Sequence, residues 1–272
     1  MSEQEVVLIT GVSSGIGQST ARLLAQRGFT VFGTSRKPSG IDAIPGVEVL
    51  PLDVRLDESV DACLEAVLKQ AERLDIVINN AGYELGGAIE ETTLEEVKAQ
   101  FETNFYGVVR MIKAVLPIMR RQGKGQIINI SSLAGLVPLP FLGVYSASKF
   151  ALEGYTEGLR HEVKPFNIQV SLVEPGFIKT NLPGNRQYVA DQISEYNPWR
   201  QRAFEAMEQY EEKASEPTLV AECVLHLIKT KSPRLRYKVG KDATSTTRLR
   251  RFLPESLFER GTRSHFRLDA KE

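Results

Sequence analysis

The stretch Val6-Val-Leu-Ile-Thr-Gly-Val-Ser-Ser-Gly-Ile-Gly17 decides the fold of this chain. Its first part, Val6–Thr10, is a short apolar run followed directly by a glycine, which predicts a buried strand. The segment that follows the turn, residues 16–27, places apolar side chains on one helical face, and Gly28 ends it. A strand, a glycine-rich turn and a helix are therefore expected in direct succession.

The glycines of this turn have separate physical roles. Gly11 permits a tight turn, Gly15 lets the backbone approach a pyrophosphate, and Gly17 allows helix and strand to pack closely. The helix that follows offers free N–H groups and the positive end of its dipole to a phosphate. Turns need glycine for structural reasons alone, but this one stands between a strand and a helix, which is the context that dinucleotide binding requires.

Strands and helices alternate along the rest of the chain. Apolar runs predict further strands at residues 30–34, 47–52, 75–79, 126–130 and 168–174. Amphipathic runs predict helices at 57–72, 94–121 (which could be broken near Thr103) and 145–163. This alternation indicates an α/β fold with a doubly wound parallel sheet (Rossmann fold) in three layers. We expect a single domain over residues 1–272.

Composition and charge limit the possible functions. The 272 residues are 42% hydrophobic and 25% charged, as in an ordinary soluble protein with a core. The 34 basic and 34 acidic residues cancel, so no overall field would attract nucleic acid or an anionic membrane. Cys63 and Cys223 fit no disulfide or metal framework, and His161, His226 and His265 lack metal-ligand spacing, so no metal is expected. Without a signal peptide or a membrane-spanning run, a cytoplasmic location is expected.

The pentapeptide Tyr145-Ser-Ala-Ser-Lys149 suggests proton-transfer chemistry. Residues four apart share one face of a helix, so the Lys149 ammonium would lie beside the Tyr145 hydroxyl. A fixed positive charge favours the phenolate, and we expect it to lower the pKa of Tyr145 from about 10. Taken alone, such residues could also form an ordinary surface pair, so the assignment depends on the other motifs.

The end of the second strand indicates the cofactor. A carboxylate there would bind the ribose 2′-hydroxyl of NAD and repel a 2′-phosphate. The strand ends at Ser35 without one, and Arg36 and Lys37 follow, with Arg36 able to bind a phosphate through two parallel hydrogen bonds. The sequence therefore favours NADP(H). The alternatives are a solvated basic loop and an NAD enzyme in which Arg36 is incidental.

These motifs, with Asn79-Asn-Ala-Gly82, Asn104 and Ser132, make the chain resemble the short-chain dehydrogenase/reductase family. The resemblance runs in register from about Val6 to Thr180 and is nearest to the 17β-hydroxysteroid and retinol dehydrogenase branches. It implies an NADP(H)-dependent oxidoreductase that interconverts a carbonyl and an alcohol. A non-catalytic NADP(H)-sensing protein on the same fold is the alternative, although such a sensor would need no proton relay.

The resemblance also implies roles for individual residues. The implied catalytic residues are Tyr145 as general acid and base, Lys149, Ser132 as the donor to the substrate oxygen (with Ser131 as its structural neighbour), and Asn104 as the residue that positions a water. The implied cofactor contacts are Gly11, Ser13, Ser14, Gly15, Ile16, Gly17, Ser35, Arg36, Asp53, Val54, Asn80, Ala81, Gly82, Tyr145, Lys149, Pro175, Gly176, Ile178 and Thr180. Asn79 could instead brace the central sheet through backbone hydrogen bonds.

The region after Thr180 would shape the substrate site. By resemblance, residues 181–215 form a lid, and this segment contains Leu182, Pro183, Tyr188, Val189, Ile193, Tyr196, Trp199, Phe204, Met207 and Tyr210. With the apolar run at residues 136–142, they favour a bulky lipophilic carbonyl or alcohol substrate. The aromatic residues could equally serve only to pack the lid on the body. Glu90, Glu91, Glu95 and Glu96 are expected to form a solvated helix start.

The C-terminal extension, about residues 244–272, mixes arginines with phenylalanines and leucines. We expect it to pack on the body or on a second subunit, with peripheral membrane contact as the lesser alternative. The family resemblance implies a homodimer or a homotetramer.

Overall fold

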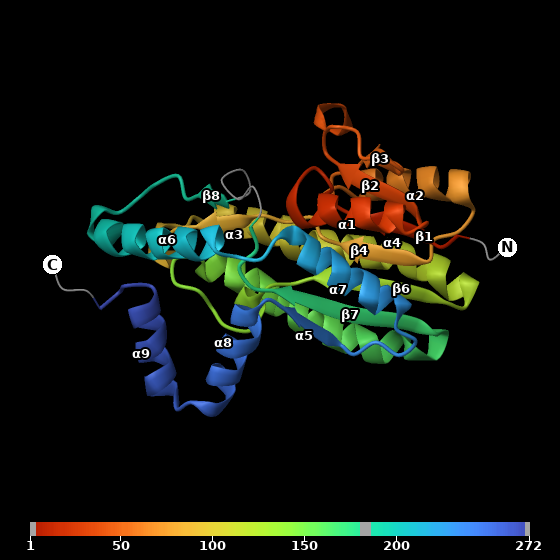
Figure 1. Ribbon diagram of the computed structural model, residues 1–272. Helices are drawn as coiled ribbons and strands as arrows, with labels where there is room; N and C mark the ends of the chain where they lie inside the picture. The colour runs from red at the N-terminus through yellow and green to blue at the C-terminus, as the bar shows by residue number, and fades with distance from the viewer. Residues whose placement is uncertain (1–3, 180–185, 270–272) are drawn as a thin grey trace.

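The computed structural model describes residues 4–179 and 186–269, and Figure 1 shows their arrangement around a central sheet. In these ranges the main sheet has seven parallel strands in the order β3-β2-β1-β4-β6-β7-β9. The strands, in chain order, are β1 (Val6–Ile9), β2 (Thr30–Ser35), β3 (Val47–Pro51), β4 (Ile76–Asn79), β6 (Gly125–Ile130), β7 (Ile168–Pro175) and β9 (Arg236–Val239). The strand order reverses between β1 and β4, which is where ligands bind in sheets of this type.

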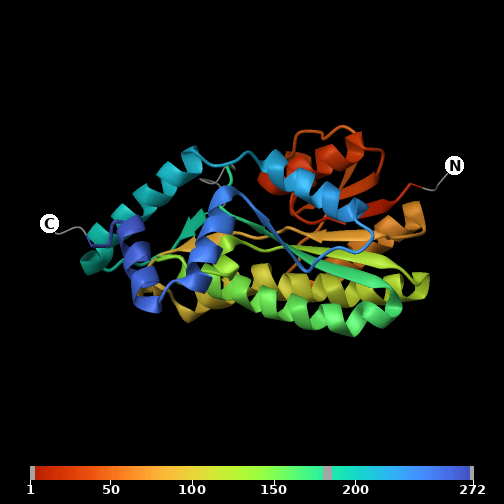
Figure 2. The same cartoon turned by 60° about the horizontal axis from the view of Figure 1, so that its bottom comes forward.

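Helices cover both faces of the sheet, so the three-layer doubly wound fold is confirmed. One face carries α1 (Gly15–Gln26) and α7 (Pro217–Lys229), and the other carries α2 (Asp57–Ala71), α4 (Gly107–Gln122) and α5 (Gly143–Val163). Figure 2 shows α4 and α5 lying across that second face. Alternate residues of β1 enter the two cores, because side chains along a strand point to opposite faces.

The helix predicted at residues 94–121 is interrupted near the expected position. It consists of α3 (Leu94–Phe101), a π-helical turn (Glu102–Tyr106) and then α4. Such turns are often found at functional sites.

The sequence did not predict the seventh strand of the main sheet, β9, since the last strand expected was the one at residues 168–174. Residues of β9 pair with β7, from Leu172 with Arg236 to Pro175 with Val239. The four residues of β9 include Arg236 and Lys238, so no apolar run indicated a strand. Arg236 is stabilised there by acidic partners on neighbouring elements.

The chain after β9 and between β7 and α7, together with the short strand that follows β4, builds a smaller region beside the sheet. Its elements are β5 (Glu84–Gly86), β8 (Arg186–Tyr188), α6 (Asn197–Glu212), α8 (Lys241–Phe252) and α9 (Glu255–His265). Strands β5 and β8 form a separate two-stranded parallel sheet. Helices α8 and α9 form a hairpin that projects from the body (Figure 1). None of the helices in the described ranges has an apolar stretch long enough to cross a bilayer.

A chain of buried polar side chains braces the centre of the molecule. The Asn79 amide donates to Asn129 Oδ1 at 2.8 Å, and the Asn129 amide donates to Thr156 Oγ1 at 2.9 Å. These bonds connect β4, β6 and α5. The expectation that Asn79 braces the sheet is confirmed, and its side chain takes part in the bracing.

Candidate active site

A cavity of about 840 Å³ lies at the carboxyl ends of the central strands. Most of the residues that the sequence assigned to the site line it. They are Gly11, Ser13, Ser14, Gly15, Ile16, Ser35, Arg36, Asp53, Val54, Asn80, Ala81, Gly82, Ser132, Tyr145, Lys149, Pro175, Gly176 and Ile178. Gly17 and Asn104 lie behind its wall, and Thr180 falls outside the described residues.

The glycine-rich turn has the backbone shape that its sequence predicted. Gly11 has φ of +73° and Gly15 has φ of +58°, values that L side chains rarely adopt. A Cβ on Gly17 would lie 2.1 Å from the Gly11 carbonyl oxygen, so only glycine fits at that position. The turn thus brings backbone close to the cavity, as a dinucleotide phosphate requires.

Asn80 holds this turn against the loop after β4. Its Nδ2 donates to the carbonyl oxygens of Thr10 at 3.0 Å and Gly11 at 2.8 Å. In return, the Thr10 hydroxyl accepts from the backbone N–H groups of Asn80 and Ala81. The Asn80 amide is therefore engaged inside the protein, and it shapes the cavity wall by fixing the turn.

A basic corner lies at the end of the cavity next to β2. Arg36 and Lys37 are exposed there, and Arg55 joins them. Asp53 accepts hydrogen bonds from Arg55, with the shortest at 2.6 Å, and these bonds and the Arg36 charge hold the pKa of Asp53 below its usual value. Because Arg55 neutralises Asp53, the corner keeps a positive charge. Sequence reasoning missed Arg55, although it stands two residues after Asp53.

Ser132 and Tyr145 both line the cavity, and their side chains lie within hydrogen-bonding reach of each other. Tyr145 lies on α5 and is buried, and Ser132 follows β6, so both side chains are held by regular structure. Burial raises the pKa of Tyr145 above its usual range, the Glu84 charge adds to the rise, and the hydrogen bond with Ser132 opposes it. Ser131 lines the cavity as well, but its hydroxyl acts on the buried Glu153 carboxyl. The choice of Ser132 over Ser131 as the donor to the substrate oxygen stays a prediction.

The expected lowering of the Tyr145 pKa is wrong, because that pKa is raised above its usual range and burial is the largest cause. The Lys149 ammonium lies 5.9 Å from the Tyr145 ring centroid and donates to the Ile130 carbonyl oxygen at 2.9 Å. Burial also lowers the pKa of Lys149 itself to about 8. Spacing alone reveals a neighbouring charge but not the loss of water around the phenol, and that loss has the larger effect. The phenol is consequently protonated at neutral pH.

Asn104 lies in the π-helical turn, fully enclosed by protein. Its Oδ1 accepts from the Tyr83 N–H at 3.1 Å, and its Nδ2 donates to the Tyr83 carbonyl at 2.9 Å and to Ser148 Oγ at 3.3 Å. Ser148 in turn donates to the Tyr145 carbonyl oxygen at 2.7 Å. The Asn104 side chain therefore connects the cavity wall at Tyr83 to the helix that carries Tyr145.

The far end of the cavity combines an apolar wall with buried charges. Leu133, Leu139, Leu142 and Phe177 supply the apolar part. The expected aromatic lining is absent: of the described residues expected from the segment after Thr180, none lines the cavity. Leu182 and Pro183 fall outside the described residues. Phe204 and Met207 instead pack α6 onto the body, so the packing alternative is correct for them.

The far end of the cavity also holds a cluster of charged side chains that the sequence did not predict. Arg186 is almost fully buried and lies opposite Glu84 in the β5–β8 pair. It contacts Glu84 at 2.9 Å and Glu211 of α6 at 2.5 Å, and all three residues line the cavity. The cluster carries one more negative than positive charge.

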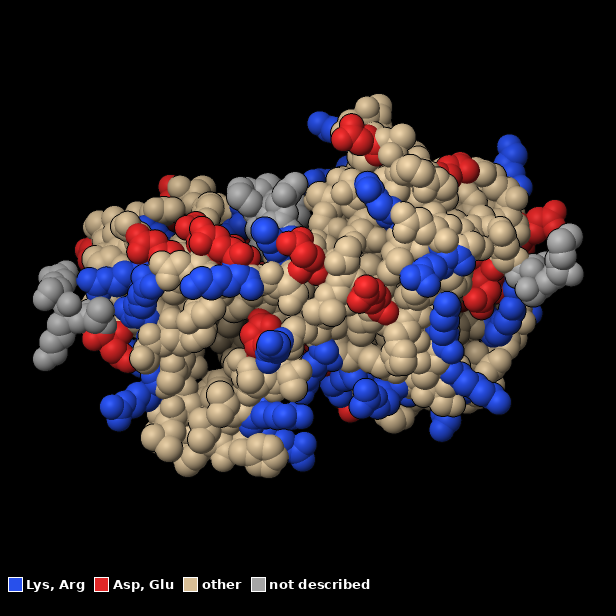
Figure 3. Space-filling view, in the orientation of Figure 1, with Lys and Arg blue, Asp and Glu red and all other residues tan. Residues whose placement is uncertain are grey.

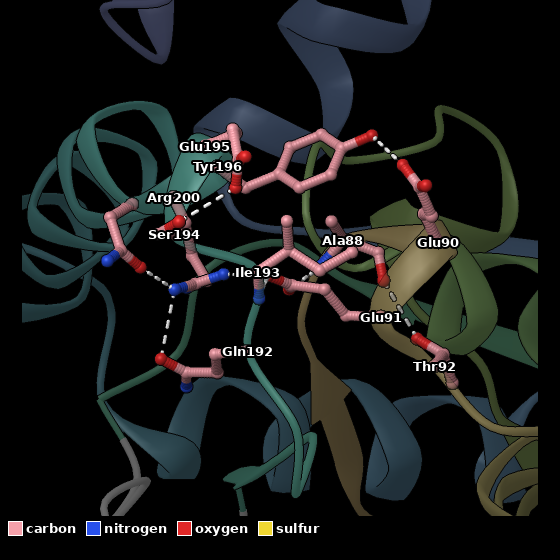
Figure 4. A network of polar contacts seen from close by, with 11 residues as sticks. Ala88, Glu90, Glu91, Thr92, Gln192, Ile193, Ser194, Glu195, Tyr196 and Arg200 are labelled. Atoms are coloured by element: carbon pink, nitrogen blue, oxygen red, sulfur yellow. Dashed lines mark hydrogen bonds and ion pairs between the residues drawn. The ribbon is translucent and has the colours of Figure 1, made fainter.

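The expectation of a solvated helix start at Glu90 and Glu91 is wrong for Glu91. Its side chain is fully buried and is paired with Arg200 of α6 (Figure 4). It also accepts from the N–H groups of Ala88 and Ile193, each at 2.8 Å. Although burial opposes the effect, these bonds hold the pKa of Glu91 below its usual value. This network fastens the segment before α6 to the body.

The remaining acidic residues at this helix start differ from one another. Glu90 accepts from the Tyr196 hydroxyl at 2.6 Å, and Glu96 closes a capping box with Thr93. Glu96 also accepts from the Ala190 N–H at 3.0 Å. Glu95 is exposed, as expected.

Comparison with known proteins agrees with this geometry. The family model described as short chain dehydrogenase matches residues 5–189. A 3-ketodihydrosphingosine reductase of Bacteroides thetaiotaomicron is 44% identical over 240 residues, which is 88% of each chain. Human retinol dehydrogenase 8 is 44% identical over 190 residues, covering 65% of this chain and 60% of the enzyme.

Solved structures show the same architecture. A short-chain dehydrogenase from Streptomyces avermitilis has 33% identity and a TM-score of 0.83, over 98% of this chain and 97% of that one. ElxO with bound NADP has 26% identity and a TM-score of 0.73, over 89% and 99% of the two chains. The chain therefore belongs to the short-chain dehydrogenase/reductase family of oxidoreductases.

Proposed function

We propose that the protein is an NADP(H)-dependent oxidoreductase that interconverts a carbonyl and a primary or secondary alcohol on a lipophilic substrate. The observation that supports this most strongly is the shared cavity. Ser132 and Tyr145 lie in the same cavity as the glycine-rich turn, so a nucleotide on the turn and a substrate at the phenol could meet. A non-catalytic nucleotide sensor would have no use for this pair.

The residues of the cavity fit NADP(H). The positive φ of Gly11 and Gly15, and the close approach of Gly17 to Gly11, leave room for a pyrophosphate at the start of α1. Arg36, with Lys37 and Arg55 beside it, would hold a 2′-phosphate. When bound, the nicotinamide supplies or accepts the hydride.

The side chains of this protein would move the proton. In carbonyl reduction Tyr145, which is protonated at neutral pH, donates its proton to the substrate oxygen, and in alcohol oxidation it takes that proton back. Ser132 donates a hydrogen bond to the same oxygen and stabilises its developing charge. The Lys149 ammonium favours the negative charge that appears on the phenol oxygen. Asn104 acts as a positioning residue through Ser148.

The far end of the cavity, where the substrate would bind, favours a lipid substrate with a polar group near the reacting carbon. Its wall at Leu139, Leu142 and Phe177 is apolar, while the cluster around Arg186 offers carboxylate oxygens. Two relatives at 44% identity are named for retinol and for 3-ketodihydrosphingosine, which are both lipids. We propose that the segment from Arg186 through α6, within residues 181–215, acts as the lid over this end.

We further propose a cytoplasmic homodimer or homotetramer. In the described part of the chain both cysteines are free thiols, as expected in a reducing compartment. Tyr106, Phe150 and Phe166 expose large apolar surface on or next to α4 and α5. A second subunit could cover them.

The function is tested by following NADPH and NADH absorbance with retinal, long-chain ketones, steroid ketones and short polar ketones. We expect consumption of NADPH with the long-chain or ring-containing carbonyls, and faster turnover than with NADH. Nucleotide binding without turnover of any carbonyl or alcohol in the panel would favour the sensor. A clear preference for NADH would contradict the cofactor assignment.

A further inference from the structure

The hairpin of α8 and α9 ends in an exposed apolar surface. We define the hairpin tip as residues 248–260, all of which the structure describes. Phe252 is the most exposed large apolar residue of the described chain, at 77%, and Leu257 and Leu249 are about half exposed. Leu253 is also exposed. Water thus surrounds a group of apolar side chains that no other part of the described chain covers.

The hairpin is also the basic part of a neutral protein. Residues 241–267 contain seven Lys or Arg and three Asp or Glu, whereas the whole chain has 34 of each kind. Arg248, Arg250 and Arg251 lie on the tip itself. Arg250 and Arg251 lie over the rings of Phe258 and Phe252, at 5.1 and 5.8 Å from the ring centres. Figure 3 shows Lys and Arg side chains among uncharged residues on the projecting part of the molecule.

This combination favours one kind of partner. Apolar side chains surrounded by arginines suit the boundary between the headgroups and the acyl chains of an anionic bilayer. A second copy of the chain is a poorer fit, because a symmetric contact through the tip would place the same arginines against one another. A surface helix pair of this kind would lie on a membrane without crossing it, in agreement with the lack of a spanning helix in the described chain.

The base of the hairpin is attached to the wall of the cavity. Asp242, at the start of α8, accepts from the Phe177 N–H at 2.6 Å, and Phe177 lines the cavity. At the end of α9, His265 stacks on Tyr210 with ring centres 4.2 Å apart, and Tyr210 stacks on Phe177. The exposed tip and the substrate end of the cavity are therefore joined through a few contacts.

From these observations we infer that the α8–α9 hairpin docks the protein on an anionic lipid surface. The apolar residues of the tip enter the outer part of the bilayer, and Arg248, Arg250 and Arg251 contact the lipid phosphates. Docking places the apolar end of the cavity near the membrane, from which a lipophilic substrate would come. The inference goes beyond the proposed reaction, and its test needs no turnover.

The test is sedimentation of the full-length protein with vesicles. Phosphatidylcholine vesicles containing phosphatidylglycerol are compared with vesicles of phosphatidylcholine alone. We expect binding to the anionic vesicles that weakens as salt is added. Replacing the three tip arginines with glutamine should weaken it about a hundredfold, and Phe252→Ser with Leu257→Ser should weaken it at least about tenfold. Leu56→Ser is the matched control, because Leu56 is as exposed as Leu257 but lies before α2.

Each variant is first checked for NADPH affinity and thermal unfolding, so that a folding defect is not read as lost docking. Failure of the wild-type protein to bind anionic vesicles would overturn the inference. It would also be overturned if the tip variants bound as well as the wild type. If the same substitutions left vesicle binding intact but reduced the oligomer size in sedimentation velocity, the tip would be a subunit interface instead.

Discussion

Gly17 lies so close to Gly11 that no side chain fits between the first helix and the turn that precedes it. A Cβ on Gly17 would lie 2.1 Å from the Gly11 carbonyl oxygen and 2.5 Å from Asn80 Nδ2. The carbonyl oxygen belongs to the backbone, so relieving the contact requires the turn itself to move. The shape of the nucleotide site and the stability of the fold therefore depend on the same position.

We expect Gly17→Ala to lower the free energy of unfolding by at least about 1–3 kcal/mol and to weaken NADPH binding. The control is Gly158→Ala, in the exposed part of α5, where a Cβ would meet no atom within 4 Å. That change should be neutral or stabilising by up to about 1 kcal/mol, because alanine favours a helix over glycine. Urea denaturation and NADPH titration of both variants test the prediction, and equal effects at the two positions would contradict it.

Replacing Arg36 with alanine should affect the two nicotinamide cofactors differently. The loss of a charge-assisted contact with the 2′-phosphate should raise KM for NADPH about 10- to 100-fold, because such bonds contribute about 1.5–3 kcal/mol. KM for NADH should change little. Arg27→Ala, at the far end of α1, serves as the control for a general change of charge. Equal changes for NADPH and NADH in the Arg36 variant would remove the cofactor assignment.

The buried pair of Glu91 and Arg200 should stabilise the fold strongly. Glu91→Gln leaves Arg200 without its charge partner, and breaking a buried pair costs about 3–5 kcal/mol. Glu95→Gln, at an exposed position nearby, should change the free energy of unfolding by less than about 0.5 kcal/mol. Denaturant titrations of both variants provide the comparison. Similar small changes in the two variants would show that the pair does not hold the segment in place.

The same pair should make stability depend on pH. The pKa of Glu91 in the folded protein lies below its ordinary value of 4.5, so the Glu91 carboxylate contributes fully to the free energy of unfolding above pH 4.5. This contribution is lost as the pH falls through the lower pKa of the folded state. The difference in unfolding free energy between wild type and Glu91→Gln should therefore shrink in acid. A difference that stayed constant down to strongly acidic pH would contradict this assignment.

Lys149 should set the alkaline limit of carbonyl reduction. Burial lowers its pKa to about 8, so the ammonium loses its proton as the pH rises through that value. The charge that favours a negative phenol oxygen is then lost, and kcat/KM should fall. Lys149→Arg keeps its positive charge throughout, so kcat/KM of this variant should not fall over the same pH range. The same alkaline fall in the arginine variant would assign the titration to another group.

The sequence predicted most of the fold and of the site because those features are local. The glycine-rich turn and the Tyr145–Lys149 spacing can be recognised within a few residues, and six of the seven strands of the main sheet were predicted from apolar runs. Features that depend on distant segments were missed or misjudged. Glu91 is buried only because Arg200, more than a hundred residues later, docks on it. The pKa of Tyr145 likewise depends on burial, which no spacing reveals.

The central claim is that the phenol of Tyr145 transfers the proton, and Tyr145→Phe tests it most directly. The change removes one oxygen from a buried ring and leaves its packing intact. We expect kcat for carbonyl reduction with NADPH to fall about 10²- to 10⁴-fold, the range of general acid catalysis, with NADPH affinity nearly unchanged. A variant that turned over at the wild-type rate would contradict the account.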